Sequence, residues 1–560
     1  MDNAVIAEHF DLLAKLMDIH GENAFRARHY ASAAFAIEKL PAPLRDTPRE
    51  RISSIRGIGD SLSKKVEELL DTGKLGILDE YIGRTPPGVI ELLRIKGIGP
   101  KKIHTIWKEM GIESIGELQY ACNENRLTRY KGFGPKTQQN VLESIAFYLQ
   151  SQGHFLYAEL APLLPQIQGF LEKMFTPGKV GLTGAWRRQS PVIEELEFIV
   201  LAPVESVKRV FQTAAPPELL EESDDSLLYR LKNGLRLRLY TGEAPMAEKL
   251  FETTGSPAFV KAFREQVPPT PVPNGSGPGD AALFENAGLP FVHPCLRESA
   301  TILQQARSGT LPELIQPTDI RGIIHSHSNW SDGTNSLEEM AEACRQKGYE
   351  YLVISDHSQT ASYANGLRPD RVQAQHRQID ALNTQLAPFR IYKSIESDIL
   401  NDGSLDYPRE ILASFDLVIA SVHSNLRMTE EKAMDRLLRA IENPYTSILG
   451  HPTGRLLLSR NGYPIDHRRI IDACAANRVV IEINAHPRRL DLDWSWIGTA
   501  IEKGVLLSID PDAHMIEGFE DVNYGILAAQ KGGLTRSHNL SSYTRAAFEN
   551  WLNVQRGKRD

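Results

Sequence analysis

Residues that can bind a metal ion follow a series of short apolar runs between positions 323 and 514. Seven such runs occur there, and six of them lead directly into histidine, aspartate or glutamate. The remaining run, residues 479–484, ends without an obvious ligand. One histidine at a strand end is more often a core residue than a ligand, but six ligand-bearing ends favour a metal site. Imidazole and carboxylate groups together suit Zn, Mn or Fe.

The apolar runs alternate with segments of helical pattern, such as residues 336–347 and 430–442. This alternation predicts parallel strands joined by crossover helices, at a usual spacing of roughly 30 residues. If the units close into a barrel, the active site forms at the C-terminal strand ends, where these ligands lie. The candidates outnumber the four ligands that one zinc takes, so we expect two or three metal ions in one cluster.

Several of these fragments are similar to the motifs of the PHP (polymerase and histidinol phosphatase) domain. They include His325-Ser-His327, Ser355-Asp356-His357-Ser358 and Ser508-Ile-Asp-Pro-Asp512-Ala-His514. The family often begins its first motif Asp-Leu-His, where this chain has Ile323-Ile324-His325. The resemblance implies a distorted seven-stranded α/β barrel with nine ligands for three metals. The matching positions are His325, His327, Asp332, His357, Glu396, His423, His451, Asp512 and His514.

The whole chain has the composition of a globular protein with several domains. It has 560 residues, and single cores rarely grow beyond roughly 250–300 residues. It shows no apolar run of the roughly 20 residues that span a bilayer, and no signal-peptide pattern. Four scattered cysteines predict a reducing compartment, so we expect a cytoplasmic, nucleoid-associated protein without a membrane partner. The net charge of −8 neither indicates nor excludes nucleic-acid binding.

Residues 1–150 read as helices separated by three glycine turns. Each turn has the form Gly-apolar-Gly, with glycines that allow tight turns and close approach of a partner. Amides at the start of the next helix then face outward, where a phosphate can accept them. One such turn could be a plain helix connection, but three in succession resemble helix-hairpin-helix motifs that bind the DNA backbone. The residues concerned are Gly57, Gly59, Gly97, Gly99, Lys101, Lys102, Gly132, Gly134 and Lys136.

With three hairpins ahead of the PHP-like region, nearly the full chain resembles the bacterial DNA polymerase X family, a family X polymerase fused to a PHP domain. The resemblance implies an all-α helix-hairpin-helix region, an α+β nucleotidyltransferase-like palm and thumb, and the barrel. The expected parts are a lyase-like domain (1–82), fingers (83–150), palm (151–242), reduced thumb and linker (243–315) and PHP nuclease (316–560). Lys65 matches the lyase nucleophile of the family, although a solvated surface lysine is the favoured interpretation.

The expected polymerase site departs from the family pattern in three ways. Gly184-Ala185-Trp186-Arg187-Arg188 resembles the Gly-Ser-x-Arg-Arg turn that holds the incoming triphosphate, with alanine in place of serine. Glu195 and Glu197 stand where the family has two aspartates, and Arg238 stands in the place of the third. Octahedral Mg²⁺ tolerates little misplacement of its ligands, so we expect no Mg²⁺ in this palm. We expect both glutamates to pair with Arg238 and the polymerase to be inactive.

The expected thumb contains a stretch rich in proline and glycine, residues 267–279, which reads as a linker. The combined interpretation is a monomeric DNA-repair nuclease that binds gapped, nicked or primer-template duplex. The family implies a 3′→5′ exonuclease, with possible roles as abasic-site endonuclease and 3′-phosphodiesterase. Arg455 and Arg489 are weaker candidates for holding substrate phosphate, the alternative being rim salt bridges.

Three other functions remain open on the sequence. The first is a bifunctional polymerase and exonuclease with a palm that still works. The second is a small-molecule phosphatase, which would need no DNA-binding hairpins. The third is a non-catalytic DNA scaffold, which the complete ligand set disfavours.

Overall fold

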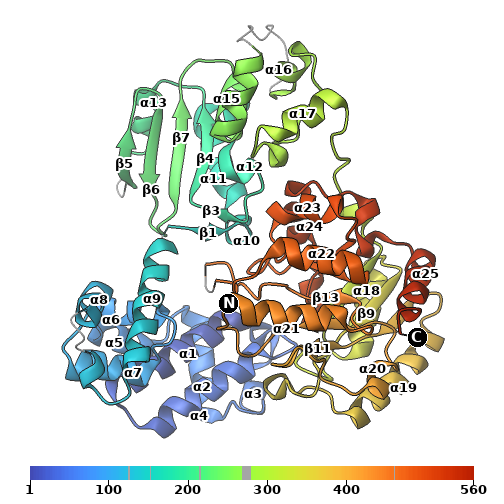
Figure 1. Cartoon of the computed structure of the whole chain (residues 1–560). Helices are drawn as coiled ribbons and strands as arrows, with labels where there is room; N and C mark the ends of the chain where they lie inside the picture. Colours follow the sequence, from blue (N-terminus) through green and yellow to red (C-terminus); the bar gives the residue numbers. More distant parts are fainter. Residues whose placement is uncertain (124–126, 152, 213–215, 268–278, 459–460, 560) are drawn as a thin grey trace. The chain divides into compact units, whose positions relative to one another are not determined.

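The structure is a computed structural model that describes residues 1–560 except 124–126, 152, 213–215, 268–278, 459–460 and 560. The chain forms two compact units, residues 1–152 and 153–560 (Figure 1). The finer division into five parts stays a prediction. Within the described residues, no helix is long and apolar enough to cross a bilayer.

The first unit is all helical, as the resemblance predicted. Its core is built on the pair α1 and α2, where Phe10 packs edge-on against Tyr30 with ring centroids 5.8 Å apart. Its helices are α1 (Asn3–His20), α2 (Ala24–Glu38), α3 (Arg49–Ile52), α4 (Asp60–Thr72), α5 (Gly76–Arg84), α6 (Pro87–Glu91), α7 (Pro100–His104), α8 (Ile115–Asn123) and α9 (Pro135–Ser151).

The three glycine turns lie between helical elements and share one backbone geometry. The first glycine of each turn has a positive φ, of 94° at Gly57, 86° at Gly97 and 92° at Gly132. A side chain at these positions would be strained, which explains the residue type. The second glycine directly precedes a helix, as Gly59 does for α4 and Gly99 for α7.

The second unit begins with a five-stranded mixed sheet in the order β2-β4-β7-β6-β5 (Figure 1). Strands β4 and β7 are parallel, and the other pairs are antiparallel. Two helices of this segment, α11 (Leu164–Phe175) and α13 (Val204–Val210), contribute to its apolar core. The strands are β2 (Val180–Leu182), β4 (Glu195–Val200), β5 (Glu218–Glu222), β6 (Ser226–Arg230) and β7 (Arg236–Thr241), and a small pair is formed by β1 (Phe155–Leu156) and β3 (Val192–Ile193).

A helical segment follows this sheet and has an aromatic core of its own. Phe251, Phe259, Phe263 and Phe284 are fully buried there. The segment's helices are α14 (Met246–Thr254), α15 (Pro257–Gln266), α16 (Ala281–Asn286) and α17 (Thr301–Ser308). Most of the expected proline-rich linker falls in residues 268–278, outside the described residues.

The C-terminal part is a ring of parallel strands in two sheets, β10-β9-β8 and β11-β12-β13-β14-β15. Single bridges join the sheets, from His357 to Glu396 at one seam and from Ser326 to Ala513 at the other. Strands β10 and β11 are one run interrupted at residues 394–395, which gives seven runs around the ring. The strands are β8 (Gly322–Ser326), β9 (Tyr351–Ile354), β10 (Arg390–Lys393), β11 (Glu396–Asp398), β12 (Ile419–Ser421), β13 (Ile448–Leu449), β14 (Val480–Asn484) and β15 (Leu507–Asp510).

Helices follow most of these strands, and their starts are fixed by local sequence. The Ser336 hydroxyl accepts the Glu339 amide at the start of α18, and the Glu339 carboxylate accepts the Ser336 amide. This capping box satisfies two backbone donors at the start of the helix. Neighbouring residues of one strand enter different apolar clusters, as Ile323 and Ile324 do, so both faces of the ring are buried. The multidomain fold class is therefore confirmed. The helices are α18 (Leu337–Gln346), α19 (Pro369–Gln385), α20 (Arg409–Leu412), α21 (Glu430–Glu442), α22 (His467–Asn477), α23 (Ile497–Glu502), α24 (Val522–Lys531) and α25 (Arg545–Arg556).

Candidate metal centre

The candidate ligands meet at the C-terminal end of the strand ring. His325 lies in β8, His357 follows β9, and Glu396 opens β11 after the interruption in its run. His423 and His451 follow β12 and β13, and the pair Asp512 and His514 follows β15. Because parallel strands end at the same edge, residues up to 189 positions apart converge on one site.

Eight of the nine candidates fall into three groups whose ligand atoms lie within 4.8 Å of one another. His327, His357 and Glu396 each belong to two of these groups, so the groups form one connected cluster. The ninth candidate, His451, contacts the cluster through Nε2, which is 3.0 Å from Glu396 Oε1. The groups are His327, Asp332, His357 and His514; His325, His327, Glu396 and Asp512; and His357, Glu396 and His423.

Glu396 is the carboxylate on which the histidines converge. Its oxygens lie 3.1 Å from His423 Nε2, 3.1 Å from His357 Nδ1 and 3.3 Å from His325 Nε2. Burial by itself would raise the pKa of Glu396, but His423, His325 and His357 outweigh it and hold that pKa well below its usual range. The carboxylate is therefore ionised and keeps its lone pairs for ligation.

His327 is held as a neutral ligand. Its side chain is fully buried, and burial together with the charges of His514 and His357 lowers its pKa to about 3. His514 behaves in the opposite way, because Asp332 and Asp512 outweigh its burial and raise its pKa to about 9. Without metal, the cluster thus mixes neutral and charged imidazoles, and His514 would have to lose a proton to bind a metal ion.

The residues present fit divalent metal ions. Three buried atoms of the cluster, His325 Nε2, His327 Nδ1 and Glu396 Oε2, make no hydrogen bond among the described residues. Leaving a buried polar atom without a partner costs about 1–3 kcal/mol, so such atoms call for an explanation. A metal ion accounts for all three, and the imidazole and carboxylate donors are those of Zn, Mn and Fe sites.

Three of the candidate ligands have left-handed backbone conformations. The φ angles are 60° at His325, 23° at His451 and 53° at Asp512. Each such residue costs about 1–3 kcal/mol and persists only where its surroundings fix it. Strain at three separate strand ends, all in the same cluster, is typical of a functional site.

Sequence reasoning missed three residues that support the ligands. Asp398 Oδ1 lies 2.5 Å from His423 Nδ1, and Glu482 bonds to His325 Nδ1. Asn484 donates to Asp512 Oδ2 at 3.1 Å. The signal that could have found the latter two is in β14, where a glutamate and an asparagine interrupt an otherwise apolar, fully buried strand.

The two rim arginines are placed differently. Arg489 Nε lies 3.6 Å from Asp512 Oδ2, at the edge of the cluster. The Arg455 guanidinium is bound to Asp493 at 2.6 Å and to the backbone carbonyls of Arg489 and Leu490. A phosphate role stays a prediction for both, and the contacts of Arg455 match the rim salt bridge that was the alternative.

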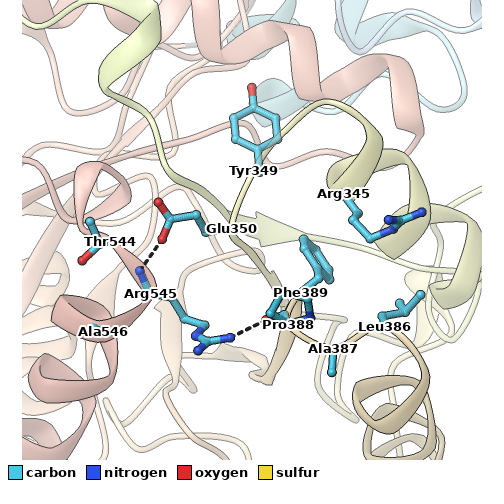
Figure 2. A pocket seen from close by; sticks show the side chains of 10 residues that line it. All are labelled: Arg345, Tyr349, Glu350, Leu386, Ala387, Pro388, Phe389, Thr544, Arg545 and Ala546. Atoms are coloured by element: carbon cyan, nitrogen blue, oxygen red, sulfur yellow. Dashed lines mark hydrogen bonds between the residues drawn. The ribbon is translucent and has the colours of Figure 1, made fainter.

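A pocket of about 550 Å³ lies at the opposite, N-terminal end of strands β9 and β10 (Figure 2). Tyr349 and Glu350 precede β9, Phe389 precedes β10, and the start of α25 completes the lining. In Figure 2 the Arg545 amide donates to Glu350 and the Arg545 guanidinium to the Pro388 carbonyl. The pocket therefore contributes nothing to the metal site.

In the palm-like sheet, the two glutamates have different partners. Glu195 accepts Arg238 Nε at 2.5 Å, and Arg238 also reaches Glu221 at 3.0 Å. Glu197 instead accepts the Ala185 amide at 2.9 Å and the Tyr240 hydroxyl at 2.9 Å. The expectation that both pair with Arg238 was therefore wrong for Glu197, although the two residues are register partners on β4 and β7.

The arginines of the turn at residues 184–188 are bound to internal carboxylates. Arg187 binds Asp280 with both terminal nitrogens, at 2.8 and 2.9 Å, and Asp280 also pairs with the buried Arg297. Arg188 binds Glu298 at 3.0 Å. Lys531 at the end of α24 bonds to the same Glu298 and donates to the Arg188 carbonyl at 2.9 Å.

In the first unit, five of the six hairpin glycines have open space where a side chain would be, and Gly57 faces Ala36 Cβ at 3.1 Å. A methyl group at Gly59, Gly97 or Gly99 would meet nothing within 4 Å, and the same holds for Gly132 and Gly134. Lys101 and Lys136 are exposed beside two of the turns. Lys65 forms an ion pair with Glu68 at 2.7 Å on a partly exposed helix face, which matches the surface interpretation.

Comparisons with known families match three parts of the chain. Residues 1–75 match a helix-hairpin-helix domain and residues 89–146 a SAM-like helix-hairpin-helix tandem. Residues 324–486 match the PHP domain.

Individual relatives agree with this division. The DNA polymerase/3′-5′ exonuclease PolX of Bacillus subtilis is 32% identical over 97% of this chain and 98% of its own length. A probable phosphatase of Caldanaerobacter subterraneus is 27% identical over 35% of this chain and 78% of its own. The probable phosphatase YcdX of Escherichia coli is 28% identical over 29% of this chain. The full-length match shows that the chain belongs to the PolX family, in which a family X polymerase region is fused to a PHP domain.

Proposed function

We propose that this protein is a metal-dependent phosphodiesterase that removes nucleotides from DNA 3′ ends during repair. The observation that carries the proposal is the connected cluster of histidines and carboxylates at the end of the barrel. Membership of a family that includes a 3′-5′ exonuclease supports DNA as the substrate. Abasic-site and 3′-phosphodiesterase activities use the same bond type and belong to the same proposal.

The proposed ligand set holds two or three divalent ions of Zn, Mn or Fe. Bound there, the ions supply positive charge to the phosphodiester and lower the pKa of a water molecule toward neutrality. Glu396 and Asp512 each touch several histidines and so fix the distances between the sites. The ligands are His325, His327, Asp332, His357, Glu396, His423, His451, Asp512 and His514.

Other residues of the chain orient the substrate. Arg489 lies beside Asp512 with a half-buried guanidinium, where it can bind a phosphate oxygen next to the metal site. Arg455 holds the loop that carries Arg489, since the Arg455 guanidinium donates to the Arg489 carbonyl at 2.9 Å. We propose that Arg489 binds a substrate phosphate and that Arg455 holds Arg489 in position.

We further propose that the polymerase site is inactive. A guanidinium in the position of the third carboxylate places fixed positive charge where a cation would bind. Glu197 takes the amide at the start of the former triphosphate turn, and Arg187 and Arg188 are bound to carboxylates. Each group that would hold a nucleotide or Mg²⁺ thus has an internal partner.

DNA affinity is proposed to come from the hairpins of the first unit. Their exposed glycines allow the DNA backbone to approach, and helix-start amides and lysines provide donors for phosphate. Such contacts position the protein without reading sequence. Binding should therefore weaken steeply with salt.

The test is an assay on primer-templates labelled at the 5′ or the 3′ end, in Mn²⁺, with and without nucleotides. We expect stepwise shortening of the 5′-labelled primer and release of label from the 3′ end. Nucleotides should not cause extension, even in an Asp512→Ala variant that cannot degrade the product. Template-directed extension by that variant would establish the bifunctional polymerase and exonuclease instead.

A phosphatase acting on small molecules is the second candidate, because probable phosphatases match the barrel portion. It predicts rapid hydrolysis of phosphomonoesters and no preference for DNA. Comparing a small phosphomonoester with a labelled primer, under the same metal conditions, separates the two functions.

A further inference from the structure

Strand β14 (Val480–Asn484) is the strand whose sequence ends without a candidate ligand, yet it lies fully buried beside the cluster. Its two polar side chains, Glu482 and Asn484, have no exposed surface. A buried carboxylate without a role would be costly, because charge is expensive to remove from water. What these side chains contact therefore indicates what the strand does.

Glu482 contacts two candidate ligands from different strands. One carboxylate oxygen bonds to His325 Nδ1, and the other accepts the His451 backbone amide at 2.5 Å. That second oxygen also accepts Asn484 Nδ2 at 3.3 Å, and the same amide group donates to Asp512 Oδ2 at 3.1 Å. The pair Glu482 and Asn484 thus reaches His325, His451 and Asp512.

These three are the candidate ligands with left-handed backbones. A strained conformation at a strand end relaxes unless neighbouring groups hold it. The hydrogen bonds from β14 act on the side chain of His325, the backbone of His451 and the carboxylate of Asp512. One ligand-free strand therefore holds each strained position in the cluster.

The contact with His325 also sets its tautomer. A carboxylate can only accept, so the proton of a neutral His325 must be on Nδ1. Nε2 then presents its lone pair to the cluster, where it lies 3.3 Å from Glu396 and 3.5 Å from Asp512. The same arrangement recurs once, between Asp398 and His423 Nδ1 at 2.5 Å.

We propose that Glu482 is the positioning residue of the metal centre, and that it fixes the tautomer of His325 while it holds His451 and, through Asn484, Asp512. This inference rests on the metal centre proposed above. A carboxylate that accepts a hydrogen bond from a ligating imidazole raises the basicity of the imidazole and fixes the orientation of its ring. Loss of such a carboxylate typically weakens metal affinity about 10- to 100-fold.

Glu482→Gln is the sharpest test because it preserves volume and leaves an oxygen for the His451 amide. Its NH₂ group would face His325 Nδ1 and donate to it, which moves the imidazole proton to Nε2. We expect Zn²⁺ or Mn²⁺ affinity of the full chain to fall about 10- to 100-fold. We also expect the nitrogen NMR shifts of His325 in the Zn²⁺-loaded protein to show the proton on Nδ1 in the wild type and on Nε2 in the variant, a change that a purely structural role would not cause.

Asp406→Asn is the matched control, since Asp406 is a buried barrel carboxylate that accepts from Thr360 rather than from a histidine. The Asp406→Asn variant should bind metal with the same affinity as the wild type. Asn484→Ala provides a second variant that leaves Glu482 in place, with a smaller expected loss of several-fold.

The outcomes separate the two proposals. If the wild type binds no divalent metal, the proposed function fails and this inference fails with it. If the wild type binds metal, and Glu482→Gln and Asn484→Ala bind it equally well with an unchanged His325 tautomer, only the positioning role is overturned. Should Glu482→Gln not fold, Asn484→Ala with wild-type affinity would overturn the role on its own.

Discussion

The structure contains two clusters of carboxylates, one mostly buried in the barrel and one partly buried in the palm-like sheet, and they differ in how their charges are matched. In the barrel, Glu396 and Asp512 face histidines, and buried polar atoms of the cluster lack hydrogen bonds among the described residues. In the palm, Glu195 is matched by a guanidinium and Glu197 by an amide and a hydroxyl. The barrel is arranged for a ligand from outside, whereas the palm is complete without one.

Under the proposal that the polymerase site is inactive, the difference indicates how a metal site can be lost without loss of fold. Two glutamates and an arginine, at the positions where the family has three aspartates, place an ion pair where three carboxylates would repel one another. Such a pair needs no cation, so the sheet can remain stable without one. Functional sites keep unfavourable arrangements that a ligand relieves, and structural sites do not.

The largest expected effect is on DNA cleavage, which should depend on the barrel carboxylates and not on those of the palm-like sheet. Asp512→Ala removes a carboxylate shared by several histidines, and we expect cleavage of a labelled primer to fall by about three orders of magnitude, because the charge supplied by metal is worth several kcal/mol. Glu195→Ala in the palm should stay within about twofold of the wild-type rate. Equal losses in the two variants would mean that both clusters take part in cleavage.

Metal binding should stabilise the protein through the barrel alone. At a free Zn²⁺ or Mn²⁺ concentration of 1,000 times Kd, one site that binds only the folded state adds about 4 kcal/mol. The measurement is thermal unfolding of the EDTA-stripped protein with and without metal. The rise in Tm should vanish in Asp512→Ala and persist in a Glu195→Ala/Glu197→Ala double variant, and its loss in the latter would place metal in the palm.

The ion pairs between Asp280 and the arginines Arg187 and Arg297 predict that the stability of the protein depends on pH. Burial disfavours the Asp280 charge, but Arg187 and Arg297 outweigh it and lower the pKa to about 2, against an ordinary value of 3.8. Because the folded-state pKa is depressed, the stabilisation of about 2 kcal/mol is complete above pH 4 and is lost as the pH falls toward 2.

Asp280→Asn removes this pair, so it should unfold at lower denaturant concentration than the wild type between pH 5 and 8. The difference in unfolding free energy should narrow below pH 4, because Asp280 of the unfolded wild type then takes up a proton while the folded protein resists protonation until about pH 2. A gap that stays constant down to pH 2 would show that the ion pairs do not account for it.

The smallest effect concerns Glu197, whose pKa is raised by burial despite its bonds to Ala185 and Tyr240. Glu197→Gln retains an oxygen for the Ala185 amide and removes the buried charge. We expect unfolding free energy to be unchanged or to rise by up to about 1 kcal/mol at pH 7. A clear loss of stability would indicate that the charge itself is needed there.

The ligand set of the barrel was predictable because the nine candidates follow six apolar runs, where a local pattern suffices. Glu482 was not, since its partner His325 lies on β8, two strands away beyond the seam that closes the ring, and only ring closure brings them together. In the palm, the resemblance to the family placed Arg238 at the position of the third aspartate, beside the glutamates. The sequence provided no strand register. It could not show that Glu221 on another strand competes for the guanidinium, or that Glu197 turns to the Ala185 amide.

The bond from Lys531 to the Arg188 carbonyl and to Glu298 has a genetic consequence. It ties the turn at residues 184–188 to α24, the helix that packs on β15 beside the candidate ligands Asp512 and His514. In a mutational scan scored by exonuclease activity, substitutions at Arg188 should therefore reduce fitness by lowering the amount of folded protein. If the polymerase site is inactive as proposed, selection would still preserve this arginine for its contacts, so its presence in a sequence survey would not by itself indicate nucleotide binding.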